Sequence, residues 1–128
     1  MISKSIENLK LYHVYLDLME YTYSISNRYV NKFQEQLIAD IIKHFNEGLY
    51  LLISTQETED CNLIINKLRE IKTHFMLCLA LIRTSRKLNI IRPNNYKAWS
   101  RKIAKLDNGF TKWINTCQEK LKQNLMKN

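Results

Sequence analysis

Apolar residues recur along this chain at alternating steps of three and four positions. That period places them on one face of an α-helix, because a helix turns by about 100° per residue. Four segments carry such a stripe, over residues 6–29, 34–54, 59–88 and 93–127. The pattern therefore predicts four amphipathic helices.

The stripes also predict which side chains form the core of the protein. In chain order these are Leu11, Tyr15, Leu18, Thr22, Ile25, Tyr29, Leu37, Ile38, Ile41, Ile42, Phe45, Leu49, Leu52, Ile53, Ile64, Leu68, Ile71, Phe75, Cys78, Ile82, Trp99, Ile103, Leu106, Phe110, Ile114, Cys117 and Leu121. Gly48 interrupts the second stripe, where it would let a neighbouring helix approach closely.

The breaks between the helices are short. Asn31 and Thr58 are predicted N-caps, since short polar side chains bind free amide groups at helix starts. Pro93 ends the third helix and opens the fourth. With two glycines and one proline in 128 residues, the chain lacks the turns of a β-sandwich or an α/β fold. We expect a single domain, 1–128, of all-α class, folded as an antiparallel up-down-up-down four-helix bundle.

Charge is distributed unevenly along the chain. Residues 1–64 carry a net charge of −4, whereas residues 65–128 carry 15 Lys and Arg against three acids, a net charge of +12. Such asymmetry favours an anionic partner, most often nucleic acid or a membrane surface. A basic outer face that is merely solvated remains the alternative, and a membrane surface fits less well because the apolar residues are needed in the core.

The positive charges follow the helical period of the last segment. Lys97, Arg101, Lys105 and Lys112 lie about 200° from the apolar stripe that begins at Trp99. Further cations near the break between the third and fourth helices extend this surface. The predicted nucleic-acid-binding residues are Arg83, Arg86, Lys87, Arg92, Lys97, Arg101, Lys105 and Lys112. Their expected role is contact with phosphates, independent of base sequence.

Patterns typical of catalysis are missing from the sequence. Two isolated glycines cannot form a phosphate-binding loop or a nucleophile elbow. The odd number of cysteines, Cys61, Cys78 and Cys117, and the lack of a C-x-x-C pair indicate reduced thiols, with Cys78 and Cys117 in the core. We expect no catalytic residues.

The histidines do not follow a metal-binding spacing. His13, His44 and His74 fall on three different predicted helices, and the Glu-x-x-His pairs of di-iron bundles are lacking. We therefore expect isolated histidines, no metal and no cofactor. The first residues have no signal-peptide pattern and no apolar run is long enough to span a bilayer, so a cytoplasmic protein without a membrane partner is expected.

Several segments resemble a known family of small four-helix bundles. The segments that carry the resemblance are residues 18–23 (LMEYTY), 81–90 (LIRTSRKLNI), 91–96 (IRPNNY), 103–106 (IAKL) and 113–114 (WI). The family comprises the accessory variability determinant proteins of diversity-generating retroelements and the proteins encoded in intervening sequences of 23S ribosomal RNA genes. Thr111 and Lys112 stand where that family usually has small residues.

The resemblance implies a function as well as a fold. The retroelement branch implies a non-catalytic accessory protein, a pentamer that binds a reverse transcriptase and RNA or DNA during mutagenic retrohoming. The ribosomal branch implies a structural or protein-interaction module, which is the alternative. Tyr12, Tyr23 and Tyr50 lie outside the apolar stripes and are candidates for contacts in a homo-oligomer, or else for ordinary packing at the bundle rim.

Overall fold

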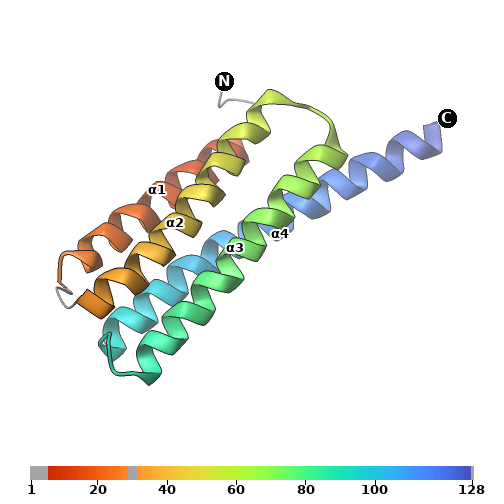
Figure 1. Cartoon of the computed structure of the whole chain (residues 1–128). Helices are drawn as coiled ribbons and strands as arrows, with labels where there is room; N and C mark the ends of the chain where they lie inside the picture. The colour runs from red at the N-terminus through yellow and green to blue at the C-terminus, as the bar shows by residue number, and fades with distance from the viewer. Residues whose placement is uncertain (1–5, 29–31, 128) are drawn as a thin grey trace.

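Four α-helices make up the fold in the computed structural model, which describes residues 6–28 and 32–127. The helices are α1 (Ile6–Ser26), α2 (Lys32–Ser54), α3 (Cys61–Lys87) and α4 (Pro93–Lys127), and a short 3₁₀ turn, η1 (Thr55–Glu57), follows α2 (Figure 1). These described residues contain no strand. The predicted all-α class and the up-down-up-down four-helix bundle are confirmed.

Each helix packs against two others. Helix α2 lies between α1 and α3, and α4 lies between α3 and α1, so that the four surround one core. The α1–α4 contact contains a buried hydrogen bond, in which Trp99 Nε1 donates to Thr22 Oγ1 over 3.0 Å. The Thr22 hydroxyl in turn donates to the Leu18 carbonyl over 2.8 Å. No polar group of this pair is left unsatisfied in the core.

The centre of the bundle is an aromatic layer to which each helix contributes one ring. Tyr15, Phe45, Phe75 and Phe110 lie with ring centroids 5.5–6.4 Å apart, and the rings of Phe45 and Phe75 are perpendicular. Such tilted and edge-to-face pairs are the favourable arrangements for aromatic side chains. The layer fixes the register of all four helices at mid-height.

Gly48 is required by this layer. The buried Tyr15 hydroxyl donates a 2.6 Å hydrogen bond to the carbonyl of Phe45 and occupies the space where a side chain at position 48 would begin. The close approach expected at Gly48 is therefore made, by a tyrosine side chain rather than by a helix backbone. Burial, with a smaller effect of the neighbouring Cys78, raises the pKa of Tyr15 far above its usual value of 10.0.

Most of the predicted core positions are buried or half-buried, but one prediction was wrong. Ile53 is 46 % exposed, whereas Leu52 before it and Ser54 after it are buried, so Ile53 lies at the outer edge of the stripe. Met19, Ile65 and Ile91 are buried although they lie beside or beyond the predicted stripes. Tyr29 lies outside the described residues.

Helix boundaries also differ from those expected. The N-cap of α3 is Asp60 rather than Thr58, since a side-chain oxygen of Asp60 accepts from the amide of Asn62 over 2.9 Å. The Thr58 hydroxyl instead accepts from the amide of Asp60 over 3.0 Å, so it binds an amide that precedes the helix. Helix α1 ends at Ser26, and the predicted cap Asn31 lies outside the described residues.

The turn between α3 and α4 is a Schellman motif. Asn89 has a φ of 58°, in the left-handed region, where asparagine is the usual substitute for glycine. The amide of Ile90 donates to the carbonyl of Ser85 over 2.8 Å, and that of Asn89 to the carbonyl of Arg86 over 3.1 Å. Pro93 then opens α4, as predicted.

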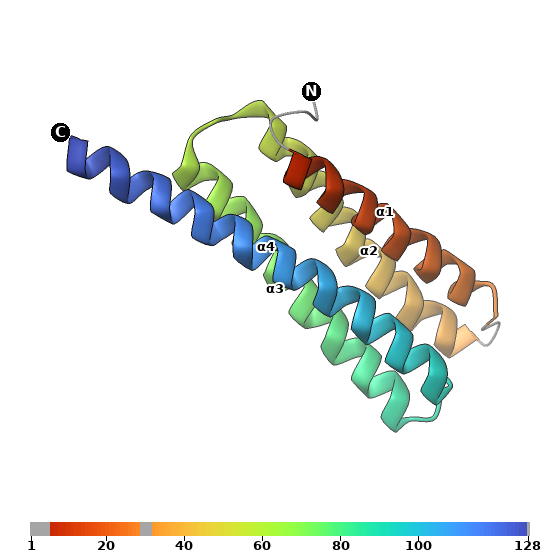
Figure 2. The same ribbon diagram turned by 180° about the vertical axis from the view of Figure 1, so that it is seen from behind.

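Helix α4 is longer than the other three. It has 35 residues, against 27 in α3, and its C-terminal turns project beyond the body of the bundle (Figure 2). The apolar side chains Leu125 and Met126 in this projection are 77 % and 87 % exposed.

Candidate nucleic-acid interface

The outward side of α4 carries the predicted stripe of cations. Lys97, Arg101, Lys105 and Lys112 are all exposed, while the stripe on the opposite side of the helix, from Trp99 to Cys117, is buried. Lys97, Arg101 and Lys105 stand at successive steps of four residues, which corresponds to a rise of about 6 Å per step. The helix therefore presents positive charges in a row on one side of the bundle (α4 is in front in Figure 2).

The end of α3 adds further cations beside the start of α4. Arg83 and Lys87 are exposed, and Arg86 is half-buried, with its Nη1 donating a long 3.5 Å hydrogen bond to Asn89 Oδ1. Arg92 is exposed immediately before α4. The Schellman turn reverses the chain here, so these side chains and the first turn of α4 lie at the same end of the bundle.

An ion pair and a hydrogen bond show how the two helices are aligned. Lys72 Nζ lies 2.9 Å from Asp107 Oδ2 and donates to Thr111 Oγ1 over 2.6 Å. Arg83 comes eleven residues after Lys72, and Lys97 comes ten residues before Asp107. Because α3 and α4 are antiparallel, Arg83 and Lys97 lie at nearly the same height. We call Arg83, Arg86, Lys87, Arg92, Lys97, Arg101, Lys105 and Lys112 together the basic face.

Few carboxylates neutralise this surface. Within the described residues, neither Arg101 nor Lys105 forms an ion pair, and the carboxylate of Asp107 is engaged by Lys72. Lys102 stands apart from the basic face, because its Nζ lies 5.3 Å from the centroid of the Tyr21 ring, on the α1 side of α4. The exposed cations of α4 are thus available to an external anion.

The cysteines have the character expected of core thiols. Cys78 and Cys117 are buried, and Cys61 is half-buried. Burial raises the pKa of Cys78 to about 12, and burial together with the neighbouring Cys61 raises that of Cys117 to about 11. Both buried thiols therefore remain protonated near neutral pH, and a protonated thiol is a poor nucleophile.

Sequence reasoning missed a cluster on the opposite side of the bundle. His44 and His74 were expected to be isolated, and this is wrong: their Nδ1 atoms lie 3.0 Å apart across α2 and α3, with Glu47 beside them. The third histidine, His13, is exposed on α1 next to Tyr12. The local signal was the His-x-x-Glu spacing of His44 and Glu47, but its partner comes from another helix.

Comparison with known proteins adds no relative. No family model, no curated protein and no solved structure matches the chain. Among the described residues, none of the helices combines the length and the apolar character that crossing a bilayer requires.

Proposed function

We propose that this protein is a non-catalytic nucleic-acid-binding protein that contacts phosphates through its basic face. The observation that supports this most directly is the row of exposed cations on the outward side of α4, in which Arg101 and Lys105 form no ion pair with any described carboxylate. A helix whose other side is packed into a core holds such charges at fixed spacing. When fixed cations neutralise the phosphates of a polyanion, the counterions condensed on that polyanion are released, which favours binding at low salt.

The proposed binding is independent of base sequence. The row consists of lysine and arginine, which contact phosphates, and the exposed positions on the same side of α4 include no aromatic ring on which a base would stack. Single-stranded and double-stranded RNA and DNA are all candidate ligands. The resemblance to retroelement accessory proteins would add a reverse transcriptase as the protein partner and a pentamer as the assembly.

Fluorescence anisotropy with labelled 20-nucleotide RNA and DNA over a salt series tests the proposal. Binding should weaken linearly on a log–log plot, with a slope of about −3 if the four cations of α4 each contact one phosphate of a single strand. Arg101→Glu with Lys105→Glu should reduce affinity at least about 100-fold at low salt.

The matched control makes the same change of charge on another surface. Lys10 and Lys43 are exposed on α1 and α2. Lys10→Glu with Lys43→Glu should therefore retain most of the affinity. Equal loss in both double variants, or no binding of the unaltered protein at low salt, contradicts a binding site on the basic face.

A protein-interaction module is the second candidate function. It is favoured by the projecting turns of α4, where Leu125 and Met126 are exposed on a helical segment that has no neighbouring helix in the described structure. A second copy of the chain would cover these side chains. Light scattering should then detect an oligomer that Leu125→Ser with Met126→Ser converts to monomer, and a monomeric unaltered protein excludes this candidate.

A further inference from the structure

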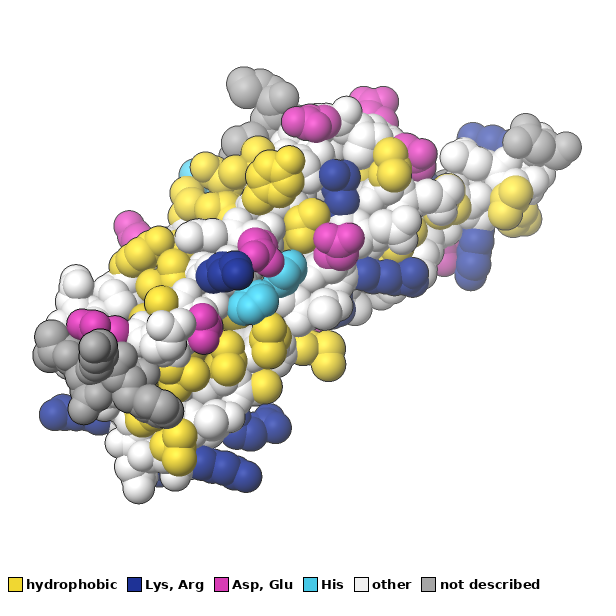
Figure 3. All heavy atoms as spheres, viewed as in Figure 1, with side chains coloured by type: hydrophobic (Ala, Val, Ile, Leu, Met, Phe, Trp, Pro, Cys, Tyr) yellow, Lys and Arg dark blue, Asp and Glu magenta, His cyan; other side chains and the backbone are white. Residues whose placement is uncertain are grey.

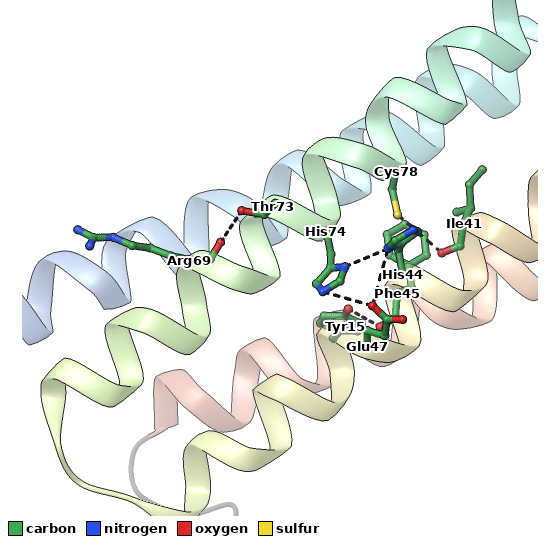
Figure 4. A network of polar contacts seen from close by, with 9 residues as sticks. All are labelled: Tyr15, Ile41, His44, Phe45, Glu47, Arg69, Thr73, His74 and Cys78. Atoms are coloured by element: carbon green, nitrogen blue, oxygen red, sulfur yellow. Dashed lines mark hydrogen bonds and ion pairs between the residues drawn. The ribbon is translucent and has the colours of Figure 1, made fainter.

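Two histidines and a glutamate converge between α2 and α3. His44 and Glu47 lie one turn apart on α2, and His74 reaches toward them from α3 (Figure 4). The Nδ1 atoms of the histidines are 3.0 Å apart, Glu47 Oε2 lies 3.5 Å from His74 Nε2, and it lies 3.9 Å from His44 Nδ1. His74 thus presents one ring nitrogen to His44 and the other to Glu47.

The three side chains lie close enough together to share a small metal ion. An ion that binds nitrogen or oxygen at about 2.0–2.1 Å in tetrahedral geometry holds its ligand atoms about 3.4 Å apart. When one ligand atom is taken from each residue, the atoms of His44, Glu47 and His74 all lie within 4.8 Å of one another. An ion bound between one nitrogen of each histidine and Glu47 Oε2 would draw these three atoms to that spacing.

The neighbouring core positions hold the ligands in place. Phe45 and Phe75 follow His44 and His74 directly in the sequence, and their rings pack edge-to-face with centroids 5.7 Å apart. The Cys78 thiol, one turn further along α3, lies 3.7 Å from the carbonyl of Ile41. The α2–α3 register that brings the ligands together is therefore fixed by buried contacts, as a preorganised site requires.

The cluster is accessible from solvent. The side chains of both histidines are 23 % exposed and that of Glu47 is 44 % exposed. Beside them lies an open groove of about 660 Å³, the α2–α3 groove, whose lining includes Lys43, Tyr50 and Glu70 as well as Glu47 and His74. Figure 3 shows the two histidines on this side of the molecule with acidic side chains close by.

The charges around the groove favour a cation on balance. Glu70 stands one turn before His74 on α3, so that it lies on the same side of the helix. The two glutamates outnumber Lys43, the cation in the lining. Three protein ligands with a fourth position facing a groove is the arrangement of zinc sites that keep a water molecule or bind a further ligand.

We propose that His44, Glu47 and His74 form a binding site for a Zn²⁺ ion, with the fourth coordination position open to the α2–α3 groove. Imidazole nitrogen and carboxylate oxygen are ligands that zinc prefers in proteins. The ion would join α2 to α3 across the edge of the bundle. Without metal, a hydrogen bond joins the two histidines and Glu47 lies within ion-pair distance of both, so the experiment must detect the ion itself.

Isothermal titration of the metal-free full-length protein with ZnCl₂ is the direct test. One equivalent should bind, and His44→Gln, His74→Gln and Glu47→Gln should each weaken binding at least about tenfold, an effect already reached when only an outer partner of a ligand is lost. His13→Gln is the matched control and should bind zinc unchanged. No binding, or equal binding by the variants, overturns the proposal.

Cobalt(II) distinguishes this cluster from the thiols of Cys61 and Cys117. Bound at the proposed site, Co²⁺ should show the visible bands of a tetrahedral ion without the near-ultraviolet charge-transfer band of a thiolate ligand. Cys61→Ser should leave that spectrum unchanged. A thiolate band that disappears with Cys61→Ser would assign the ion to the cysteines and overturn the proposal.

A thermal measurement tests whether the bound ion links the two helices. Saturating Zn²⁺ should raise the Tm of the unaltered protein by about 5 °C or more, because the ion binds the folded chain and not the unfolded one. The double variant His44→Gln with His74→Gln should fold, since both side chains are partly exposed, and should show no such rise. An equal rise in the double variant contradicts the proposed ligands.

Discussion

The basic face and the α2–α3 groove lie on different sides of the bundle and arise in different ways. The cations of α4 follow from the period of one helix, so that Lys97, Arg101 and Lys105 share a side whatever that helix packs against. The histidine cluster exists only because α2 and α3 meet in one register, which brings together residues 30 apart in the sequence. A surface encoded within one helix can be read from its residues, whereas a site shared by two helices depends on the fold.

The largest expected effect separates the two surfaces. Arg101→Glu with Lys105→Glu should reduce nucleic-acid affinity at least about 100-fold and leave zinc affinity within about twofold, because exposed charges across the bundle are screened within about 10 Å at 0.1 M salt. His74→Gln should instead weaken zinc binding and leave nucleic-acid affinity nearly unchanged. Anisotropy and calorimetry on both variants measure this, and a change of both activities in either variant would show that the two surfaces are coupled.

The two glycines provide the next test, since each lies beneath one of the surfaces. Gly48→Ala places a methyl group against the hydroxyl of Tyr15, which is held by its bond to Phe45, and should lower the free energy of unfolding by about 1–2 kcal/mol. Gly109→Ala meets only the methyl end of Leu11, which no hydrogen bond holds in place, so a small shift of that side chain and the helical preference of alanine should make the change nearly neutral. Urea denaturation measures both.

Removal of the Tyr15 hydroxyl tests whether this group causes the destabilisation by Gly48→Ala. In a Tyr15→Phe background the cost of Gly48→Ala should fall by about 1 kcal/mol or more, since the ring carbon behind the hydroxyl is at an ordinary contact distance of 3.5 Å. An unchanged cost would mean that the clash is with another group.

The buried thiols behind the two surfaces predict a dependence on pH. In the unfolded chain these thiols ionise near pH 9, but in the folded protein Cys117 keeps its proton to about pH 11 and Cys78 to about pH 12. Between these pH values the folded state binds more protons than the unfolded state. The free energy of unfolding should therefore keep its full value below pH 9 and fall as pH rises toward 12. Tyr15, whose pKa is also raised, adds to this loss at the upper end.

Urea denaturation at several pH values between 8 and 11 measures this loss. Cys78→Val should make the decline shallower, because valine has no proton to lose. A decline that is equally steep in the variant would attribute the effect to other groups.

The smallest effect is expected at the ion pair between α3 and α4. Asp107→Asn should lower the free energy of unfolding by no more than about 1 kcal/mol, because Lys72 and Asp107 are both partly exposed. The same change releases Lys72 and removes a negative charge beside the basic face, so nucleic-acid affinity should rise by a few-fold at low salt. Thermal denaturation and anisotropy measure the two effects, and a weaker affinity would contradict the proposed role of the basic face.

The sequence predicted the helices and most of the core but not the details of their ends. The stripe of Trp99, Ile103 and Phe110 is buried as expected, because burial of an amphipathic helix follows its period. Ile53 was assigned to the stripe of α2 together with Leu52, but it is turned about 100° from Leu52 and is exposed. The cap at Asp60 was misplaced because Thr58 and Asp60 both have side chains that bind amide groups.

Sequence reasoning also predicted one of the two candidate sites and missed the other. The predicted exposed positions of the basic face agree with the structure, apart from Arg86, which is half-buried. The nucleic acid proposed to bind the basic face stays a prediction, because charge indicates a polyanion without identifying it. The pairing of His44 with His74 lay outside sequence reasoning, because a residue spacing within one helix carries no information about the height at which the next helix packs.

The hydrogen bond between Trp99 and Thr22 has a consequence for the order in which the fold assembles. It joins residues 77 apart, whereas the histidine pair spans 30, and contacts that close longer loops cost more chain entropy. Helix α1 also makes the least extensive contacts with its neighbours, so we expect the α2–α3 hairpin to form first and α1 to dock last, which closes the ring of helices. Pulse-labelling hydrogen exchange should then protect amides of α2 and α3 before those of α1. The proposed zinc ligands would be assembled on a local hairpin, and the basic face would gain its complete support only when α1 packs against α4.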